Sequence, residues 1–439
     1  MSKADFYGWR LLAAFWFVLF INLAFPAYGA GVINTYMALD LHLTRQMVGL
    51  PYSVYLLMSG LPGPLAALCV NRRGIRFTLV LGGLMVMTGS LLMALFVSSG
   101  VGAIFAFGML VGGGVATGGA VATQTGVARW FVRRRALALS ILLSGGGFGG
   151  FVAARLLDSV IRAAHGNWRM GWWVVAGLSA LATLVAAVFA KERPEDLGQL
   201  PDGGDSTARP EAARAWRAPS RLRVHVTTEQ WTFREASRTA ALWLMFACAV
   251  GVSGTFAMLV AHGGVHMRDL GHPVSAGAVV ISTMTLASLL AKAVVATLGD
   301  RLDPRYIWAV FTAVCGAGAL LAVDARTTAQ IYVFAACVGS GFGGMLVCLM
   351  AVLSNYYGLK VYASVVGLAI AIQTAGSSIV PPLAGLLYDR TGTYTPAFYA
   401  VAGVCFAGAV TLLLIRPPLR RISVRTNAGG HAPSAGATT

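Results

Sequence analysis

The chain has 439 residues, of which 57% are hydrophobic and only 11% are charged, whereas soluble domains carry about 25% charged residues. This composition, with a mean hydropathy of +0.72, excludes an ordinary soluble protein and favours packed membrane helices. The net charge of +17 would suit a nucleic-acid partner, but the basic residues form short clusters between apolar runs. Such clusters are typical of membrane-topology signals, so we expect no nucleic-acid binding.

Twelve apolar runs of about 18–28 residues follow one another along the chain. Each is long enough to cross a bilayer as a helix, and all are too long and too uniformly apolar for the alternating strands of a membrane barrel. We therefore predict an all-α membrane protein with about twelve transmembrane helices. The predicted spans are 9–37, 46–70, 77–97, 101–128, 136–161, 169–190, 239–266, 275–299, 306–323, 328–354, 362–388 and 396–415.

Residues 191–238 interrupt this pattern with Pro, Gly, Asp and many Arg, and they divide the spans into two sets of six. We predict an N-terminal six-helix bundle (1–190), a cytoplasmic linker (191–238), a C-terminal six-helix bundle (239–416) and a disordered cytoplasmic tail (417–439). The end of the linker, 231–238, is predicted to form a short amphipathic helix on the inner membrane surface.

The short loops alternate between more and less positive charge. The richer set lies on the same side as the basic residues at both ends of the chain, so the positive-inside rule predicts that both termini are cytoplasmic. The richer set holds Arg72, Arg73, Arg76, Arg129, Arg133, Arg134, Arg135, Arg301, Arg305 and Lys360, and the other set holds Arg45, Arg162, Arg169, Arg268, Arg326 and Arg390.

Several classes of activity lack support in the sequence. The six cysteines are scattered within apolar runs, without a metal-ligand spacing or a disulfide framework. No nucleophile–base constellation and no nucleotide-binding motif is found, so we expect neither an enzyme nor a primary pump, and no cofactor. The first span starts near Trp9 and is too long for the apolar core of a signal peptide, so it should remain as a helix.

The two sets of spans are similar to each other. The segment NRRG (71–74) follows the second span of the first set, and the pair Asp300-Arg301 follows the second span of the second set, which is the eighth overall. Related halves of six helices are the architecture of major facilitator carriers, which bind substrate between the halves near the bilayer midplane. The sequence therefore predicts this fold.

Four segments carry a closer resemblance: PPLAGLLYDRTGTYTPAFYAVAG (381–403), WFVRRRALALS (130–140), RPEDLGQLPDG (193–203) and YGW (7–9). All four resemble the monocarboxylate transporter cluster of the major facilitator superfamily, which also holds oxalate/formate-type antiporters. The segments 193–203 and 7–9 are similar to bacterial members of this cluster. The resemblance implies alternating-access transport of a carboxylate by a monomeric protein of the bacterial inner membrane.

Lys292 interrupts an otherwise apolar span, 275–299, eight residues before Asp300, or about 12 Å along a helix. A cation at such depth is costly, and its default interpretation is functional. By the resemblance, Lys292 stands at the position of the substrate-binding arginine of monocarboxylate carriers, so we predict that it binds a small carboxylate anion. The alternative is a lysine that extends to the interface or pairs with an unidentified acid.

The chain departs from the proton-linked members that it resembles. Ser288 stands where they carry an aspartate four residues before the arginine, and Ala27 stands where they carry a lysine in the first span. The eleventh span offers Gln373, Ser377 and Ser378 in place of the second cation of oxalate-type antiporters. One buried cation favours a singly charged anion. A further hypothesis is that Lys292 itself carries the coupling proton, since burial disfavours its charged form.

Polar side chains inside other spans are further candidates for substrate contact, with interhelical packing as the alternative for each. They are Asn22, Tyr28, Tyr52, Tyr55 and Gln373.

Two groups of residues are predicted to control conformation. By resemblance, Asn71, Arg72, Asp300 and Arg301 belong to loops that latch the inward-closed state, although Asn71 replaces the superfamily's aspartate. Arg155, Asp158 and Arg162 share one face of the fifth span and are predicted to form an outer gate or anion funnel, with a local ion pair as the alternative. His262 and His266, four residues apart, are interpreted as a pH-responsive interfacial pair, since no third metal ligand is evident.

We therefore predict secondary transport of a small monocarboxylate by alternating access, with proton-coupled symport. One alternative is an organic-anion exchanger or an efflux carrier for aromatic acids. An alternative from another class is a transporter-like carboxylate sensor, which an additional signalling domain would distinguish.

Overall fold

The computed structural model describes residues 6–132, 134–203, 225, 227, 229–298 and 302–418. Within this part of the chain the regular structure is entirely helical, with no strand, which confirms the predicted all-α class. The helices are α1 (Gly8–Asn22), η2 (Phe25–Gly29), α2 (Ala30–Asp40), α3 (Arg45–Gly60), α4 (Gly63–Arg73), α5 (Ile75–Leu95), α6 (Gly100–Ala103), η3 (Ile104–Val111), α7 (Gly112–Gly118), α8 (Ala120–Trp130), α9 (Arg135–Ala163), α10 (Arg169–Phe189), η4 (Pro194–Leu197), η5 (Pro201–Gly203), α11 (Phe233–Ala236), α12 (Ala240–Asp269), α13 (Ala276–Leu298), α14 (Pro304–Ala322), α15 (Thr328–Tyr357), α16 (Leu359–Thr391) and α17 (Thr395–Leu414).

Eleven helical stretches of the described residues are long and apolar enough to cross a membrane. The bent pair α3 and α4, whose axes differ by 44°, makes a twelfth if it counts as one span, in agreement with about twelve predicted spans. The first span is interrupted at Pro26, which cannot donate a backbone hydrogen bond. There the chain passes through the π-helical turn η2 between α1 and α2, and this turn carries Tyr28.

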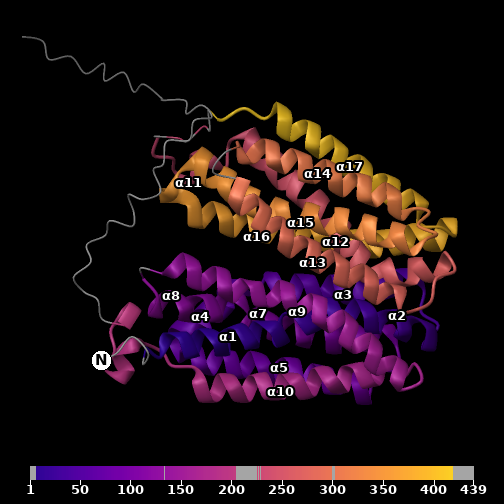
Figure 1. Cartoon of the computed structure of the whole chain (residues 1–439), viewed down its shortest axis with the longest axis horizontal. Coiled ribbons are helices and arrows are strands. Elements are labelled where there is room, and N and C mark those ends of the chain that lie inside the picture. Colours follow the sequence, from indigo (N-terminus) through magenta and orange to yellow (C-terminus); the bar gives the residue numbers. More distant parts are fainter. Residues whose placement is uncertain are drawn as a thin grey trace, which may run out of the picture.

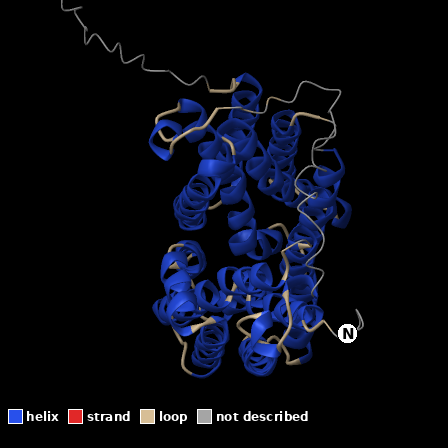
Figure 2. Cartoon of the chain, turned by 90° about the vertical axis from the view of Figure 1, so that its left-hand side faces the viewer, coloured by secondary structure: helices blue, strands red, loops and turns tan. Residues whose placement is uncertain are grey.

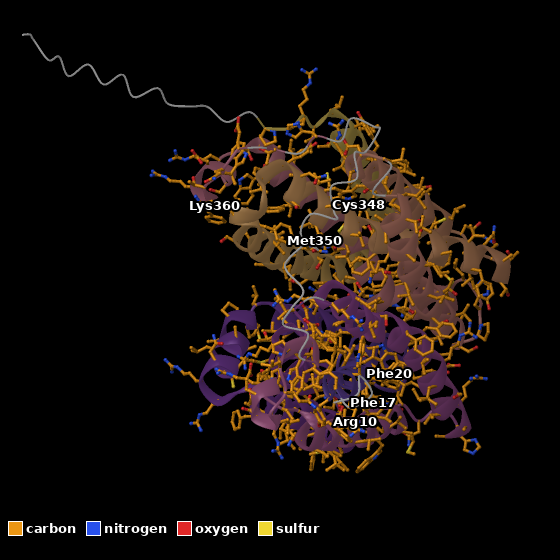
Figure 3. All side chains as sticks on the ribbon, turned by 60° about the vertical axis from the view of Figure 1, so that its left-hand side comes forward. Arg10, Phe17, Phe20, Cys348, Met350 and Lys360 are labelled. Carbon is orange, nitrogen blue, oxygen red and sulfur yellow. The ribbon has the colours of Figure 1, made fainter. Side chains whose placement is uncertain are left out.

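The helices form two groups. Figure 1 shows α1–α10, from indigo to magenta, below α11–α17, from orange to yellow, and Figure 2 shows the same two groups one above the other from the side. We call them the N-half and the C-half. Side chains fill both halves, with Phe17 and Phe20 in the lower one and Cys348 and Met350 in the upper one (Figure 3). The halves meet where α9 packs on α13, α3 on α16 and α2 on α12.

We name the two ends of these halves by what lies there. The linker end is where α8 and α11 lie, on the left of Figure 1, and the far end is where α2 lies, on the right. Trp130 ends α8 and so belongs to the linker end, whereas Arg45, which follows α2, and its partner Asp269 belong to the far end. The predicted domain boundaries fall between α10 and α12, but most of the linker and the tail from residue 419 lie outside the described residues.

The first part of the linker is held against the N-half. The Glu192 carboxylate accepts hydrogen bonds from the backbone N–H groups of Ile75 (2.9 Å) and Arg76 (3.0 Å), where α5 begins, and it lies 3.4 Å from Arg129 Nη1. Asp202 accepts a hydrogen bond from the backbone N–H of Val132 (3.0 Å), just before α9. Carboxylates are favourable at helix N-termini because they bind free N–H groups there.

The predicted amphipathic helix 231–238 is found as a single turn, α11. Its start is fixed by a reciprocal cap between Thr232 and Glu235. Trp231 is only 2% exposed, and its ring lies 5.4 Å from that of Tyr357. This segment therefore packs on the C-half through its aromatic residue.

Candidate functional site

Lys292 lies on α13, at the contact between the halves. Its side chain is half-buried and makes no ion pair or hydrogen bond with any described residue. Leu289, one turn earlier on the same face, contacts α9, because a Cβ added at Gly147 would lie 3.5 Å from its Cδ1. Thr285, a further turn away, would lie 2.7 Å from a Cβ added at Gly150. Lys292 is therefore a cation without a described partner, next to the opposite half.

A layer of aromatic rings joins the halves near Thr285. Tyr28 of η2 meets Phe256 of α12 edge to face, with 6.2 Å between ring centroids, and Phe256 stacks on Phe342 of α15 at 4.2 Å. Tyr28 is half-buried, and its hydroxyl makes no hydrogen bond with a described residue. Tyr28 also lies beside Gly150 of α9, where an added Cβ would come within 2.5 Å of its ring.

Two further tyrosines of the N-half lie on α3 and stack on each other. Tyr52 and Tyr55 have 5.8 Å between ring centroids. Tyr55 also stacks on Phe107 at 4.8 Å, and its buried hydroxyl has no hydrogen-bond partner in the described part of the chain.

Gln373 approaches the aromatic layer from the C-half. Its Nε2 donates a hydrogen bond of 2.6 Å to Ser253 Oγ and lies 4.0 Å from Met345 Sδ. Ser253 is one turn before Phe256 on α12, and Met345 is one turn after Phe342 on α15. Gln373 therefore lies beside the same aromatic pair as Tyr28.

Asn22 lies elsewhere. It is 2% exposed, and its amide is 3.3 Å from a Cβ added at Gly83 of α5, next to Thr183 of α10. Neither amide atom has a hydrogen-bond partner among the described residues. The structure thus brings Tyr28 and Gln373 together beside Phe256 and Phe342. Tyr52, Tyr55 and Asn22 pack within the N-half.

At the far end the predicted gating residues of α9 take part in two contacts. Arg155 Nε donates a hydrogen bond of 2.9 Å to Ser282 Oγ of α13, which joins the halves. Asp158 accepts hydrogen bonds from the Tyr36 hydroxyl (2.8 Å) and Arg162 Nε (2.9 Å). The local ion pair, which was the alternative to a gate or funnel, is present between Arg162 and Asp158, and Arg155 makes the contact across the halves.

A second far-end cluster was not among the predicted gating residues. The Asp389 carboxylate of α16 accepts hydrogen bonds from the backbone N–H groups of Arg45 and Gln46, each at 3.0 Å, and so caps α3 from the opposite half. Arg45 Nη2 pairs with Asp269 of α12 at 2.6 Å. In the sequence these charges stand at span ends on one side, but no spacing indicates which of them meet.

At the linker end the predicted latch residues show no such contact. Asn71 and Arg72 are exposed and make no hydrogen bond with a described residue, while Asp300 and Arg301 lie outside the described residues. Within the described ranges, the hydrogen bonds between the halves therefore all involve Arg45, Gln46 or Arg155 at the far end.

The chemistry of the site follows from these groups. An unpaired ammonium attracts an anion strongly where water is scarce, phenol and amide groups orient it, and aromatic faces cover its apolar part. The site between the halves is suited to a small organic anion with one charge.

The sequence profile described as Major Facilitator Superfamily matches residues 11–280 and 265–437. The chain is 24% identical over 419 residues to "Monocarboxylate transporter 2" of Rattus norvegicus, with 93% of this chain and 83% of that protein covered. It is 26% identical over 360 residues to "Monocarboxylate transporter 13" of Bos taurus, with 80% and 76% covered.

Solved structures share the fold. A peptide transporter, POT, in complex with sulfate superimposes with a TM-score of 0.70 at 16% identity, covering 94% of this chain and 97% of that one. A D-xylose-proton symporter superimposes with a TM-score of 0.69 at 13% identity, covering 92% and 97%. These similarities extend over nearly the whole chain.

Proposed function

The chain belongs to the major facilitator superfamily, and from that premise we propose that it carries a small monocarboxylate by alternating access, in symport with a proton. It is an integral membrane transporter rather than an enzyme, and its curated relatives are monocarboxylate transporters. The observation that carries the substrate class is Lys292, an unpaired cation at the contact between the halves. A carboxylate bound there would gain its charge partner from the C-half and hydroxyl donors from the N-half.

In this proposal Tyr28, Tyr52, Tyr55 and Gln373 orient the substrate, and Asn22 supports α1 from a distance. Arg155 and Asp158 act at the far-end gate, since Arg155 bonds to Ser282 across the halves. Asn71, Arg72, Asp300 and Arg301 act in the latch that closes the linker end in the opposite state.

We assign the linker end and both termini to the cytoplasm, because the loops at that end carry more arginine. The resemblance to bacterial carriers supports the inner membrane of a bacterium, and function as a monomer is the expectation for this superfamily.

A proton-flux assay tests the proposal. Purified protein in liposomes that hold a pH-sensitive dye is given a panel of aliphatic, hydroxylated and aromatic monocarboxylates, with protein-free liposomes as the control for passive entry of protonated acids. Wild type is compared with Lys292→Ala and with Lys360→Ala, which removes an exposed lysine at the start of α16. We expect one acid to acidify the lumen with wild type and Lys360→Ala only.

The Phe256–Phe342 stack beside Tyr28 favours a second candidate, exchange or efflux of an aromatic acid. This alternative predicts no net acidification, but faster uptake of labelled aromatic anion into liposomes preloaded with unlabelled anion. If neither assay distinguishes Lys292→Ala from wild type, the role assigned to Lys292 is wrong.

A further inference from the structure

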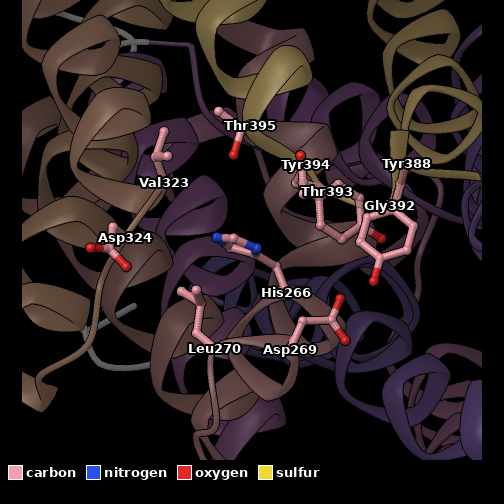
Figure 4. A pocket seen from close by; sticks show the side chains of 10 residues that line it. All are labelled: His266, Asp269, Leu270, Val323, Asp324, Tyr388, Gly392, Thr393, Tyr394 and Thr395. Atoms are coloured by element: carbon pink, nitrogen blue, oxygen red, sulfur yellow. The ribbon is translucent and has the colours of Figure 1, made fainter. Parts of the chain in front are cut away.

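A pocket of about 400 Å³ opens at the far end, among the loops that follow α12, α14 and α16. Figure 4 shows His266 reaching into it between Asp324 and Tyr394, with Asp269 below. The side chain of His266 is nevertheless 5% exposed. This pocket lies apart from the proposed substrate site, and the transport proposal leaves it unused.

The hydrogen bonds of His266 fix which ring nitrogen is free. Its Nε2 lies 2.7 Å from the carbonyl oxygen of Ala322, which only accepts, so Nε2 carries the proton. Its Nδ1 has no hydrogen-bond partner among the described residues, and the residue lines the pocket. By contrast, both ring nitrogens of His262, one turn earlier, are bonded, to the Pro381 carbonyl (2.8 Å) and the Tyr394 hydroxyl (3.0 Å).

The groups around His266 connect it to the far-end contact between the halves. Asp269, one turn later on the same face of α12, is the residue that pairs with Arg45 of α3 at 2.6 Å. Arg45 in turn lies over the Tyr388 ring, 4.9 Å from its centroid. The titratable and charged groups that face His266 are Asp269 and His262 on α12, Arg45 on α3, Tyr388 on α16, and His272, Asp324 and Tyr394 in the loops.

Most of these neighbours are already engaged. Asp324 pairs with Arg326 at 2.7 Å, and His272 Nε2 bonds to the Ala325 carbonyl at 2.6 Å. Burial raises the pKa of the Tyr394 phenol above its ordinary value, so this hydroxyl keeps its proton. Asp269 differs from Asp324 because its ion pair, with Arg45, joins the two halves.

We propose that Nδ1 of His266 is a proton-binding site, loaded from the far-side solution through this pocket, and that the proton weakens the far-end contact between the halves. The imidazolium adds a second cation beside Asp269, so it competes with Arg45 for the carboxylate and repels the guanidinium. Acid on the far side then favours the far-open state, in which substrate enters from that side. The effect is present while the imidazole is protonated, in acid, and is lost as rising pH leaves it neutral. This inference rests on the proposed transport function, since it assigns a regulator of the same cycle.

Hydrogen exchange tests the inference without transport. The backbone N–H groups of Arg45 and Gln46 are bonded to Asp389 across the halves, so their exchange reports far-end opening. Full-length wild type, His266→Gln and the control His272→Gln are compared in nanodiscs at about pH 5.5 and pH 7.5. Rates are compared between variants at the same pH, because the intrinsic exchange rate of an amide itself depends on pH. We expect wild type and His272→Gln to exchange about fivefold faster than His266→Gln at the lower pH, with equal rates at the higher pH.

Equal rates of wild type and His266→Gln at both pH values would overturn the proposal. If His266→Gln does not fold, Asp269→Asn gives a second test. The Arg45 and Gln46 amides of Asp269→Asn should exchange fast at both pH values, and a wild-type pH response in this variant also overturns the proposal.

A transport assay separates the two proposals by measuring the exchange of labelled acid across the membrane at equal pH on both sides. No exchange by wild type counts against the transport function, whereas acid-stimulated exchange that persists in His266→Gln counts against the proton site alone.

Discussion

The two ends of the molecule use their charged residues in different ways. At the far end, Asp389 caps α3 from the opposite half and Arg45 pairs with Asp269, so the bonds run between the halves. At the linker end, Glu192 caps α5 within the N-half, and Arg305 donates a hydrogen bond to the Ile415 carbonyl within the C-half.

In the proposed transport cycle, this difference would give one chain two stable halves and a contact that opens. Bonds within a half keep its helix ends together in every state, whereas bonds between halves must break whenever the far end opens. Rocking of two such units about a central site is the usual form of alternating access. In the proposed cycle the far-end bonds would therefore set the balance between states, and the linker-end bonds would set the stability of each half.

The largest effect is expected at Lys292, a charged residue between the halves that takes part in the contacts of neither end. Lys292→Gln keeps length and polarity but removes the charge that a carboxylate would need. Loss of one partner of a buried charge pair costs about 2–5 kcal/mol, so substrate affinity should fall about 30-fold or more. Isothermal titration of the acid found in the flux assay measures this. Unchanged affinity in Lys292→Gln, against an unchanged Lys360→Gln control, would place the substrate elsewhere.

The next prediction concerns close packing at the far end. A Cβ at Gly385 of α16 would lie 2.5 Å from the Arg45 carbonyl oxygen and 2.6 Å from Gln46 Cα. Because these are backbone atoms, Gly385→Ala should force the far end apart, at a cost of about 1–3 kcal/mol. Exchange of the Arg45 and Gln46 amides should accelerate about tenfold or more.

The matched control is Gly403→Ala on α17, where an added Cβ meets nothing within 4 Å. It should leave exchange at Arg45 and Gln46 unchanged. If Gly385→Ala is as protected as this control, the far end does not close through this packing.

Some features of the fold and of the candidate site could be predicted from the sequence. The number and position of the spans follow from apolar length alone, and the all-helical fold was predicted correctly. Lys292 could be singled out because one charge in an apolar run is conspicuous. Tyr28 could not be placed from the sequence, because it lies in the π-helical turn Phe25–Gly29, which no local pattern predicted.

Contacts between segments far apart in the sequence were not accessible in this way. The motif that ends the eleventh span was recognised as a resemblance, but nothing in it tells that Asp389 caps a helix 344 residues earlier. Ser288, which replaces an aspartate of the carriers that the chain resembles, packs its backbone against Gly343 of α15, where an added Cβ would overlap it. Such close approaches depend on how helices meet, which no local pattern encodes.

A smaller effect is expected when the hydrogen bonds from Arg45 and Gln46 to Asp389 are weakened without forcing the helices apart. Asp389→Asn retains one acceptor oxygen but loses the charge at the start of α3, so we expect the far-end contact to lose about 1–2 kcal/mol. Amide exchange at Arg45 and Gln46 should rise several-fold. Asp202→Asn, which alters a cap within the N-half, is the control and should leave that exchange as in wild type. The reverse pattern would contradict the division between the two ends.

The smallest expected effect tests the linker end directly. Glu192→Gln keeps an acceptor for the N–H groups of Ile75 and Arg76 but removes the negative charge at the start of α5 and beside Arg129. A charge at a helix N-terminus stabilises by about 0.3–1 kcal/mol, so the melting temperature should fall by about 1–3 °C, as followed by thermal unfolding in detergent. Exchange at Arg45 and Gln46 should not change, because Glu192 binds only groups of its own half. Faster exchange at those two amides in Glu192→Gln would mean that the linker end also controls the far-end contact, and the two ends would then have to be treated as one coupled gate.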